Sequence, residues 1–134
     1  MNMEIIPIET KVHTDLVDIT DQIHRVIKKK GVNDGMVFIY SPHTTAGITI
    51  NEGADPAVKM DIINMLEKIV PRGFDYRHLE GNSHAHIKAS LVGSGATVIV
   101  EDGDLYLGRW QRIFFCEFDG PRSRQIWVKI GRLS

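Results

Sequence analysis

The fold of this chain is decided by residues 96–118, which read Ala-Thr-Val-Ile-Val-Glu-Asp-Gly-Asp-Leu-Tyr-Leu-Gly-Arg-Trp-Gln-Arg-Ile-Phe-Phe-Cys-Glu-Phe. Runs rich in β-branched and aromatic residues predict strands over 96–100, 105–107 and 111–118. The Asp-Gly-Asp between the first two runs is typical of a hairpin turn. In the last run apolar side chains occur at odd and even positions, which predicts a strand buried on both faces, with one face a candidate subunit interface.

Strand and helix patterns follow one another irregularly outside this stretch. Asp55-Pro56 places a capping residue and a first-turn proline at the start of a helix that ends before Pro71. Other apolar patterns predict strands over 5–10, 13–19, 36–40, 46–50 and 125–130, and helices over 20–30 and 85–92. About seven strands with two or three helices, not strictly alternating, predict an α+β fold of mostly antiparallel strands in one domain, residues 1–134.

The bulk composition excludes several classes of function. The chain is 43% hydrophobic and 25% charged, as is ordinary for a globular protein, and its net charge of −1 predicts no nucleic-acid or membrane partner. No apolar run approaches the ~20 residues that span a bilayer, and the N-terminus has no signal-peptide pattern. We therefore expect a cytoplasmic protein whose single Cys116 is a packed thiol.

Four of the six histidines fall in two short polar regions. His43 stands in Ser-Pro-His-Thr-Thr, and His84 and His86 stand in Gly-Asn-Ser-His-Ala-His with His78 just upstream. Imidazole is the commonest metal ligand, and ligation by histidines alone leaves an open position, as in catalytic zinc sites. His84 and His86 would share one face of an extended segment, but on a helix they would diverge by about 200°.

Polar residues near these histidines are candidates for catalysis. Thr44 and Thr45 offer hydroxyl and backbone donors beside His43. Glu52, after the next strand, is a candidate general base or a partner that fixes an imidazole tautomer, and Asn51 beside it is a candidate substrate contact.

Three further residues are candidate substrate contacts. Asn82 precedes His84 and His86 in the sequence. Trp110 could stack on a planar ring, and Gln111 could hydrogen-bond it. Arg109 could fork onto a phosphate. The alternative is that Trp110 packs in the core and Arg109 lies on the surface.

Three motifs occur one after another along the chain. Together they resemble the YjbQ-like family, which is often labelled secondary thiamine-phosphate synthase. The motifs are Ser-Pro-His-Thr-Thr-Ala-Gly-Ile-Thr-Ile-Asn-Glu-Gly-Ala-Asp-Pro, Glu-Gly-Asn-Ser-His-Ala-His-Ile-Lys-Ala-Ser and Gly-Arg-Trp-Gln-Arg-Ile. The resemblance covers residues 5–132. It implies a β-sandwich-like α+β fold, and a homotrimer whose sheets pack about the threefold axis.

The resemblance also implies roles for single residues. It places the metal set on His43, His78 and His86, whereas His84 lies where other members vary. The family usually has threonine at the position of Arg109, so Arg109 inherits no role from it.

Three functions are therefore expected. The first is thiamine-phosphate synthesis, which joins hydroxymethylpyrimidine diphosphate to a thiazole phosphate and releases diphosphate. Departure of diphosphate usually uses Mg²⁺, which prefers oxygen ligands, whereas three imidazoles suit Zn²⁺ or a similar ion. The second is therefore metal-dependent hydrolysis of a small phosphorylated substrate, with Glu52 as base. The third is a non-catalytic trimer that binds a metal or an anion.

Overall fold

The computed structural model describes residues 3–134, so Met1 and Asn2 of the predicted domain lie outside the described residues. The elements are β1 Met3–Glu9, β2 Asp15–Asp18, α1 Thr20–Lys29, β3 Gly35–Tyr40, β4 Ala46–Glu52, α2 Pro56–Ile69, α3 Ser83–Val92, β5 Gly95–Glu101, β6 Asp104–Leu105, β7 Gln111–Glu117 and β8 Ser123–Arg132.

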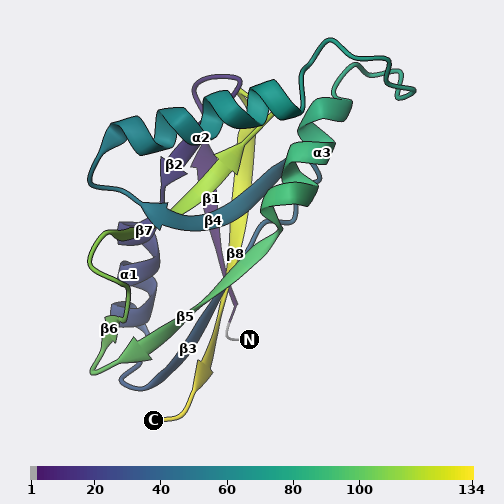
Figure 1. Ribbon diagram of the computed structural model, residues 1–134. Coiled ribbons are helices and arrows are strands. Elements are labelled where there is room, and N and C mark those ends of the chain that lie inside the picture. The colour runs from purple at the N-terminus through teal and green to yellow at the C-terminus, as the bar shows by residue number, and fades with distance from the viewer. Residues whose placement is uncertain (1–2) are drawn as a thin grey trace.

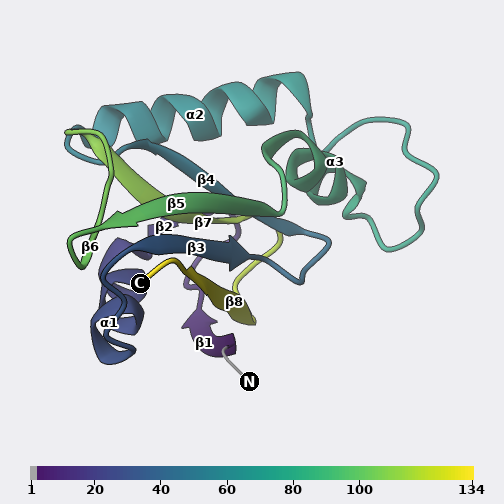
Figure 2. The same ribbon diagram turned by 90° about the horizontal axis from the view of Figure 1, so that it is seen from below.

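Two antiparallel sheets carry the fold, as Figure 1 shows. The larger sheet has the strand order β1-β8-β3-β5-β6, and the smaller one has the order β2-β7-β4. The predicted α+β class and antiparallel pairing are confirmed, with eight strands in place of about seven. Helices α2 and α3 lie over the smaller sheet, and the larger sheet lies on its other side (Figure 2).

The central strand β7 is buried on both faces, as its sequence predicts. Ile113 and Phe115 join the main core between the sheets, while Phe114 and Cys116 face a second cluster under α2 and α3. Both faces are thus covered within one chain, and the expectation that one face of this strand meets another subunit is wrong. Burial raises the pKa of the Cys116 thiol to about 12, which agrees with the predicted packed thiol.

Helix boundaries follow the local chemistry. Asp55 caps α2, since its Oδ1 accepts a hydrogen bond of 2.9 Å from the Ala57 amide, and Pro56 occupies the first helical position. Helix α3 begins at Ser83, two residues before the predicted start, so His84 and His86 both lie on a helix.

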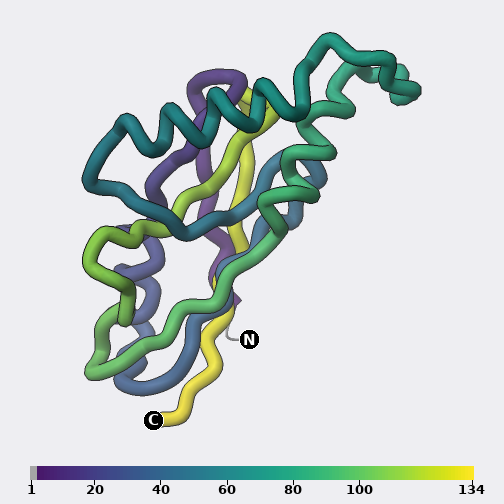
Figure 3. Tube along the Cα trace, viewed as in Figure 1, coloured from purple at the N-terminus to yellow at the C-terminus, as the bar shows by residue number. Residues whose placement is uncertain are grey.

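The segment over residues 71–82 has no regular structure and extends away from the body of the molecule, as the tube in Figure 3 shows. It connects α2 to α3 and carries His78. Among residues 3–134, no helix combines the length and the apolar composition needed to cross a membrane.

Candidate functional site

A polar hollow of about 340 Å³ opens where three connections meet. The β3–β4 loop brings His43 and Thr44, the start of α3 brings Asn82 and His86, and the β7–β8 turn brings Arg122. Pro42, Thr45, Glu80 and Arg124 complete the lining. The hollow therefore gathers five of the predicted site residues, namely His43, Thr44, Thr45, Asn82 and His86.

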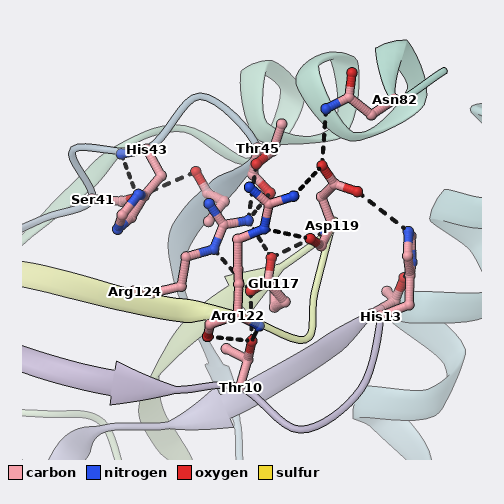
Figure 4. Close-up of polar contacts among 12 residues, drawn as sticks. Thr10, His13, Ser41, His43, Thr45, Asn82, Glu117, Asp119, Arg122 and Arg124 are labelled. Carbon is pink, nitrogen blue, oxygen red and sulfur yellow. Dashed lines mark hydrogen bonds and ion pairs between the residues drawn. The ribbon is translucent and has the colours of Figure 1, made fainter. Parts of the chain in front are cut away.

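A buried ion pair forms the floor of this hollow (Figure 4). Glu117 is 0% exposed and Arg124 is 6% exposed, and the Arg124 guanidinium hydrogen-bonds both carboxylate oxygens. The hydroxyl of Thr10 donates to Glu117 at 2.8 Å, and Arg124 donates to the Thr45 hydroxyl at 2.9 Å. Burial opposes ionisation of Glu117, but the hydrogen bonds from Arg124, the Asp119 amide and Thr10 outweigh it and lower the pKa of Glu117.

Asp119 links this floor to the rim of the hollow. Arg122 donates from Nε to the Asp119 carbonyl at 2.9 Å and from Nη2 to its carboxylate at 3.0 Å. Asn82 donates to the same carboxylate oxygen at 2.9 Å. The Nη1 group of Arg122 has no hydrogen-bond partner among residues 3–134, and the side chain is half exposed. Arg122 is thus the cation of the hollow that remains available to an anion.

The backbone of Gln125 fixes the His43 ring through its Nε2, which lies 3.1 Å from the Gln125 carbonyl oxygen and 3.0 Å from the Gln125 amide. The tautomer with its proton on Nε2 donates to the carbonyl and leaves Nδ1 as an acceptor for a ligand or a proton, whereas the other tautomer accepts from the amide and carries its proton on Nδ1. Burial lowers the pKa of His43, and the nearby Arg124 guanidinium lowers it further. A neutral imidazole beside Arg122 can accept a proton or bind a metal ion at neutral pH.

His86 lies between His43 and His78. It lines the hollow with His43, and its ring centroid is 5.3 Å from that of His78, with the two rings perpendicular. In residues 3–134, however, no three side chains among His, Cys, Asp and Glu are arranged to hold a metal ion. The structure therefore brings the three predicted ligands to one neighbourhood without forming a ligand set, and we derive no chemical step through a metal.

His84 faces away from the hollow, because on a helix it diverges by about 200° from His86, which lines the hollow. It is 2% exposed, and its ring stacks on that of His13 at a centroid distance of 5.5 Å. Burial and the neighbouring Lys88 lower the pKa of His84, while Lys88 itself pairs with Glu67 at 2.5 Å. This side of α3 is a packed polar cluster, and His84 takes no part in the hollow.

The other predicted residues lie elsewhere. Asn51 and Glu52 end β4, and Glu52 pairs with Gln111 at the start of β7. Because β4 is seven residues long, they lie about 20 Å from its His43 end. Trp110 is 54% exposed, so the alternative that it packs in the core is wrong, and the Arg109 guanidinium lies 4.8 Å from its ring centroid. Within one chain these four residues do not reach the hollow.

Sequence reasoning missed the charged residues in and beside the β7–β8 turn. Glu117 stands in an apolar run, and Arg124 has the same parity as Ile126 and Val128 in β8, so the pattern places both at buried positions. A charged side chain at a buried strand position requires an ionic partner. That signal could have found the pair Glu117–Arg124 and, with it, the turn that carries Arg122.

Comparison with known proteins matches nearly the whole chain to one protein family. The family model described as UPF0047 protein YjbQ-like matches residues 4–132. The chain is 58% identical over 123 residues to a UPF0047 protein of Methanocaldococcus jannaschii, covering 92% of this chain and 89% of that protein. It is 46% identical over 129 residues to the UPF0047 protein YugU of Bacillus subtilis, covering 96% and 98%. The crystal structure of an uncharacterized conserved YjbQ/UPF0047 protein from Clostridium acetobutylicum is similar with a TM-score of 0.94 at 52% identity, covering 96% of this chain and 99% of that one.

Proposed function

Because this chain belongs to the YjbQ-like UPF0047 family, we propose that the His43 hollow is the active site of a thiamine-phosphate synthase-like transferase. In this reaction the thiazole nitrogen attacks the methylene carbon of hydroxymethylpyrimidine diphosphate, and the bond from that carbon to the diphosphate oxygen breaks. A single observation carries the proposal: the Nη1 group of Arg122, which has no hydrogen-bond partner among residues 3–134, lines the same hollow as His43.

The departing diphosphate is the group that the hollow would stabilise. Arg122 would hold its negative charge, since charge-assisted hydrogen bonds from arginine to phosphate are strong. The Thr44 hydroxyl lies at the exposed rim, where it can donate to a second oxygen. Arg124 on the floor is neutralised by Glu117 and its hydrogen bonds are used by Glu117 and Thr45, so it holds the hollow in place rather than binding the anion.

Hydrolysis of a small phosphorylated substrate is the second candidate. The His43 ring favours it, because the tautomer that donates from Nε2 to the Gln125 carbonyl leaves Nδ1 able to take a proton from an attacking water. In this case the base is His43 rather than Glu52, which lies at the far end of β4. The non-catalytic alternative is that the hollow only binds an anion.

A homotrimer belongs to the proposal. The outer face of the larger sheet exposes apolar side chains at 39–54% of their surface, namely Ile5, Met36, Phe38, Tyr40 and Ile99. Contiguous apolar surface of this kind is typical of subunit interfaces. Packing of these sheets about a threefold axis would bury this apolar surface, and the mass of the protein in solution tests the oligomeric state directly.

The cytoplasmic location stays a prediction.

Thiamine-phosphate formation by chelator-treated protein, with Mg²⁺ and Zn²⁺ added back separately, tests the proposed activity. We expect turnover by the wild type and its loss in His43→Ala, with the exposed His24→Ala as a control that retains it. Phosphate release from the single substrates under the same conditions would favour hydrolysis. Binding without either reaction would favour the non-catalytic alternative.

The metal is tested separately by elemental analysis of the purified protein. A histidine-bound Zn²⁺ or similar ion predicts a loss of metal content in His43→Ala, His78→Ala and His86→Ala. Wild-type metal content in all three variants would contradict this ligand set.

A further inference from the structure

A second hollow, of about 380 Å³, adjoins the His43 hollow within the same chain. Both are lined by Pro42, His43, Thr44 and His86, so the two imidazole rings stand where the hollows meet. The second hollow is called here the Tyr40 compartment, and its remaining lining residues are Tyr40, Ser41, Ala89, Ser90 and Ser94.

Charge is confined to one side of this pair of hollows. Among the described residues that line the Tyr40 compartment there is no Asp, Glu, Lys or Arg. The His43 hollow carries Arg122, whose Nη1 group has no hydrogen-bond partner among residues 3–134. Its one carboxylate at the rim, Glu80, is 75% exposed and lies 3.8 Å from Nε2 of His78. A ligand that fits both hollows would therefore be anionic at one end and uncharged at the other.

Tyr40 gives the uncharged side a flat surface. On β3 it pairs with Trp127 of β8 on one side and with Gly95 of β5 on the other. Its ring stacks on that of Trp127 at a centroid distance of 5.8 Å, which holds it in place. Gly95 has no side chain to cover the other side, where a Cβ would lie 3.4 Å from Cδ1 of the ring. The Tyr40 side chain is 48% exposed, so part of its ring is open to a planar group.

Hydroxyl groups form another part of the Tyr40 compartment. Ser90 and Ser94 are both exposed at its rim. The Ser90 hydroxyl donates to the His86 carbonyl at 3.0 Å and can still accept a hydrogen bond. Polar atoms at the edge of a planar group could thus be hydrogen-bonded while its face lies on Tyr40.

From these observations we propose that the Tyr40 compartment binds the uncharged, planar part of a small phosphate ester whose phosphate lies on Arg122. The bond between the two parts of the ligand would then lie beside His43 and His86. This inference deepens the proposed function and rests on its anion site, but it needs no turnover and uses the residues of one chain.

Calorimetric titration with three phosphate monoesters tests it on the full chain. Methyl phosphate carries the anion alone, benzyl phosphate adds a flat ring, and cyclohexylmethyl phosphate adds a ring that is not flat. We expect the wild type to bind benzyl phosphate more tightly than the other two. Tyr40→Leu should bind benzyl phosphate roughly 2- to 10-fold more weakly and methyl phosphate as the wild type does. Tyr106→Leu, the same change at a tyrosine that is 69% exposed and lines neither hollow, is the control.

Filling the compartment gives a second variant that leaves Tyr40 in place. Ser90 is exposed on α3, so Ser90→Trp places a large side chain in the compartment without disturbing the core. We expect this variant to lose the preference for benzyl phosphate and to keep its affinity for methyl phosphate. Asn64→Trp, at an exposed position of α2 that lines neither hollow, should retain both affinities.

The outcomes separate this inference from the proposed function. Equal affinity of the wild type for benzyl phosphate and either of the other esters would overturn the planar site and leave the anion site on Arg122 standing. A preference that survives both Tyr40→Leu and Ser90→Trp would do the same. The protein is titrated in its solution state, so a second copy that covered Tyr40 would produce the first of these results. Failure of all three esters to bind would overturn the anion site and the planar site together.

Discussion

The two ends of β4 differ in how firmly the fold holds their polar side chains. At the His43 end, Glu117, Arg124 and Thr45 are buried and joined by hydrogen bonds that cross from strand to strand. At the other end, the side chains of Glu52 and Gln111 each accept one hydrogen bond from a backbone amide three residues away, and within residues 3–134 neither bonds to a side chain of another strand. A preorganised site needs supporting contacts of the first kind. By this criterion the His43 end is the better preorganised of the two ends.

The buried ion pair should give the largest effect on stability. Glu117→Ala leaves the Arg124 guanidinium buried without its partner, and we expect a loss of about 3–5 kcal/mol in the free energy of unfolding. Urea denaturation measures it. Lys59→Ala, which removes the partner of Asp15 from a more exposed pair, is the matched control and should stay near the wild type. Equal effects of the two substitutions would contradict the claim that the buried pair supports the fold more strongly than an exposed pair beside it.

Lowering the pH should reduce the free energy of unfolding through His84, a buried histidine of α3 near the His43 end of β4. Burial holds the pKa of His84 below its ordinary value of 6.5, so the folded chain binds fewer protons than the unfolded chain just below that pH. The stability linked to His84 is therefore fully present above pH 6.5 and is lost as the pH falls through the folded pKa. We expect His84→Gln to flatten the dependence of the unfolding free energy on pH below 6.5.

His84→Gln and wild type should show the same slope between pH 7.5 and pH 8, which separates this effect from a general loss of packing. An unchanged slope below pH 6.5 would show that His84 is not held neutral by the fold.

The cap of α2 should give an intermediate effect at the exposed end of β4. Asp55→Ala removes the hydrogen bond to the Ala57 amide, and we expect a loss of about 1 kcal/mol in the free energy of unfolding. Asp55→Asn keeps an acceptor at the same place and should retain most of that stability. A loss well above that of an ordinary cap would mean that this end is held more firmly than its contacts indicate.

Glu52 should give the smallest effect. Its carboxylate accepts one hydrogen bond, from the Asp55 amide, at the protein surface. We expect Glu52→Gln to change the free energy of unfolding by less than about 0.5 kcal/mol. Thermal unfolding monitored by circular dichroism is sufficient to detect a larger change, which would argue that Glu52 supports the fold more than its single hydrogen bond indicates.

Local signals in the sequence predicted most of the fold. The strand runs of 96–118 and the start of α2 at Asp55-Pro56 depend on neighbouring residues, and the structure has them where predicted, apart from shifts at element ends. The sequence left the start of α3 open. His84 and His86 share a face if they precede the helix and diverge if they lie on it, and the two cases differ only in where the helix begins. Helix ends depend on tertiary contacts such as the hydrogen bond from Asn82 to Asp119.

The site was predicted only in part, since it depends on which segments meet in space. The histidine motifs indicated the β3–β4 loop and α3, and both line the hollow. Arg122 and Asp119 carry no motif that a single sequence reveals, because their role comes from a turn folded against α3. Glu52 and Trp110 were grouped with His43 by chemistry, although the length of β4 separates them within one chain.

Calorimetric titration of the protein with inorganic diphosphate tests the central claim most directly, namely that the Nη1 group of Arg122, without a partner among residues 3–134, makes the His43 hollow an anion site. Loss of a hydrogen bond between charged groups, worth about 1.5–3 kcal/mol, predicts that Arg122→Gln weakens binding roughly 10- to 100-fold. Arg25→Gln, the same change at an exposed position of α1, should bind as the wild type does. Equal affinity of wild type and Arg122→Gln, or no binding by the wild type, would contradict the account.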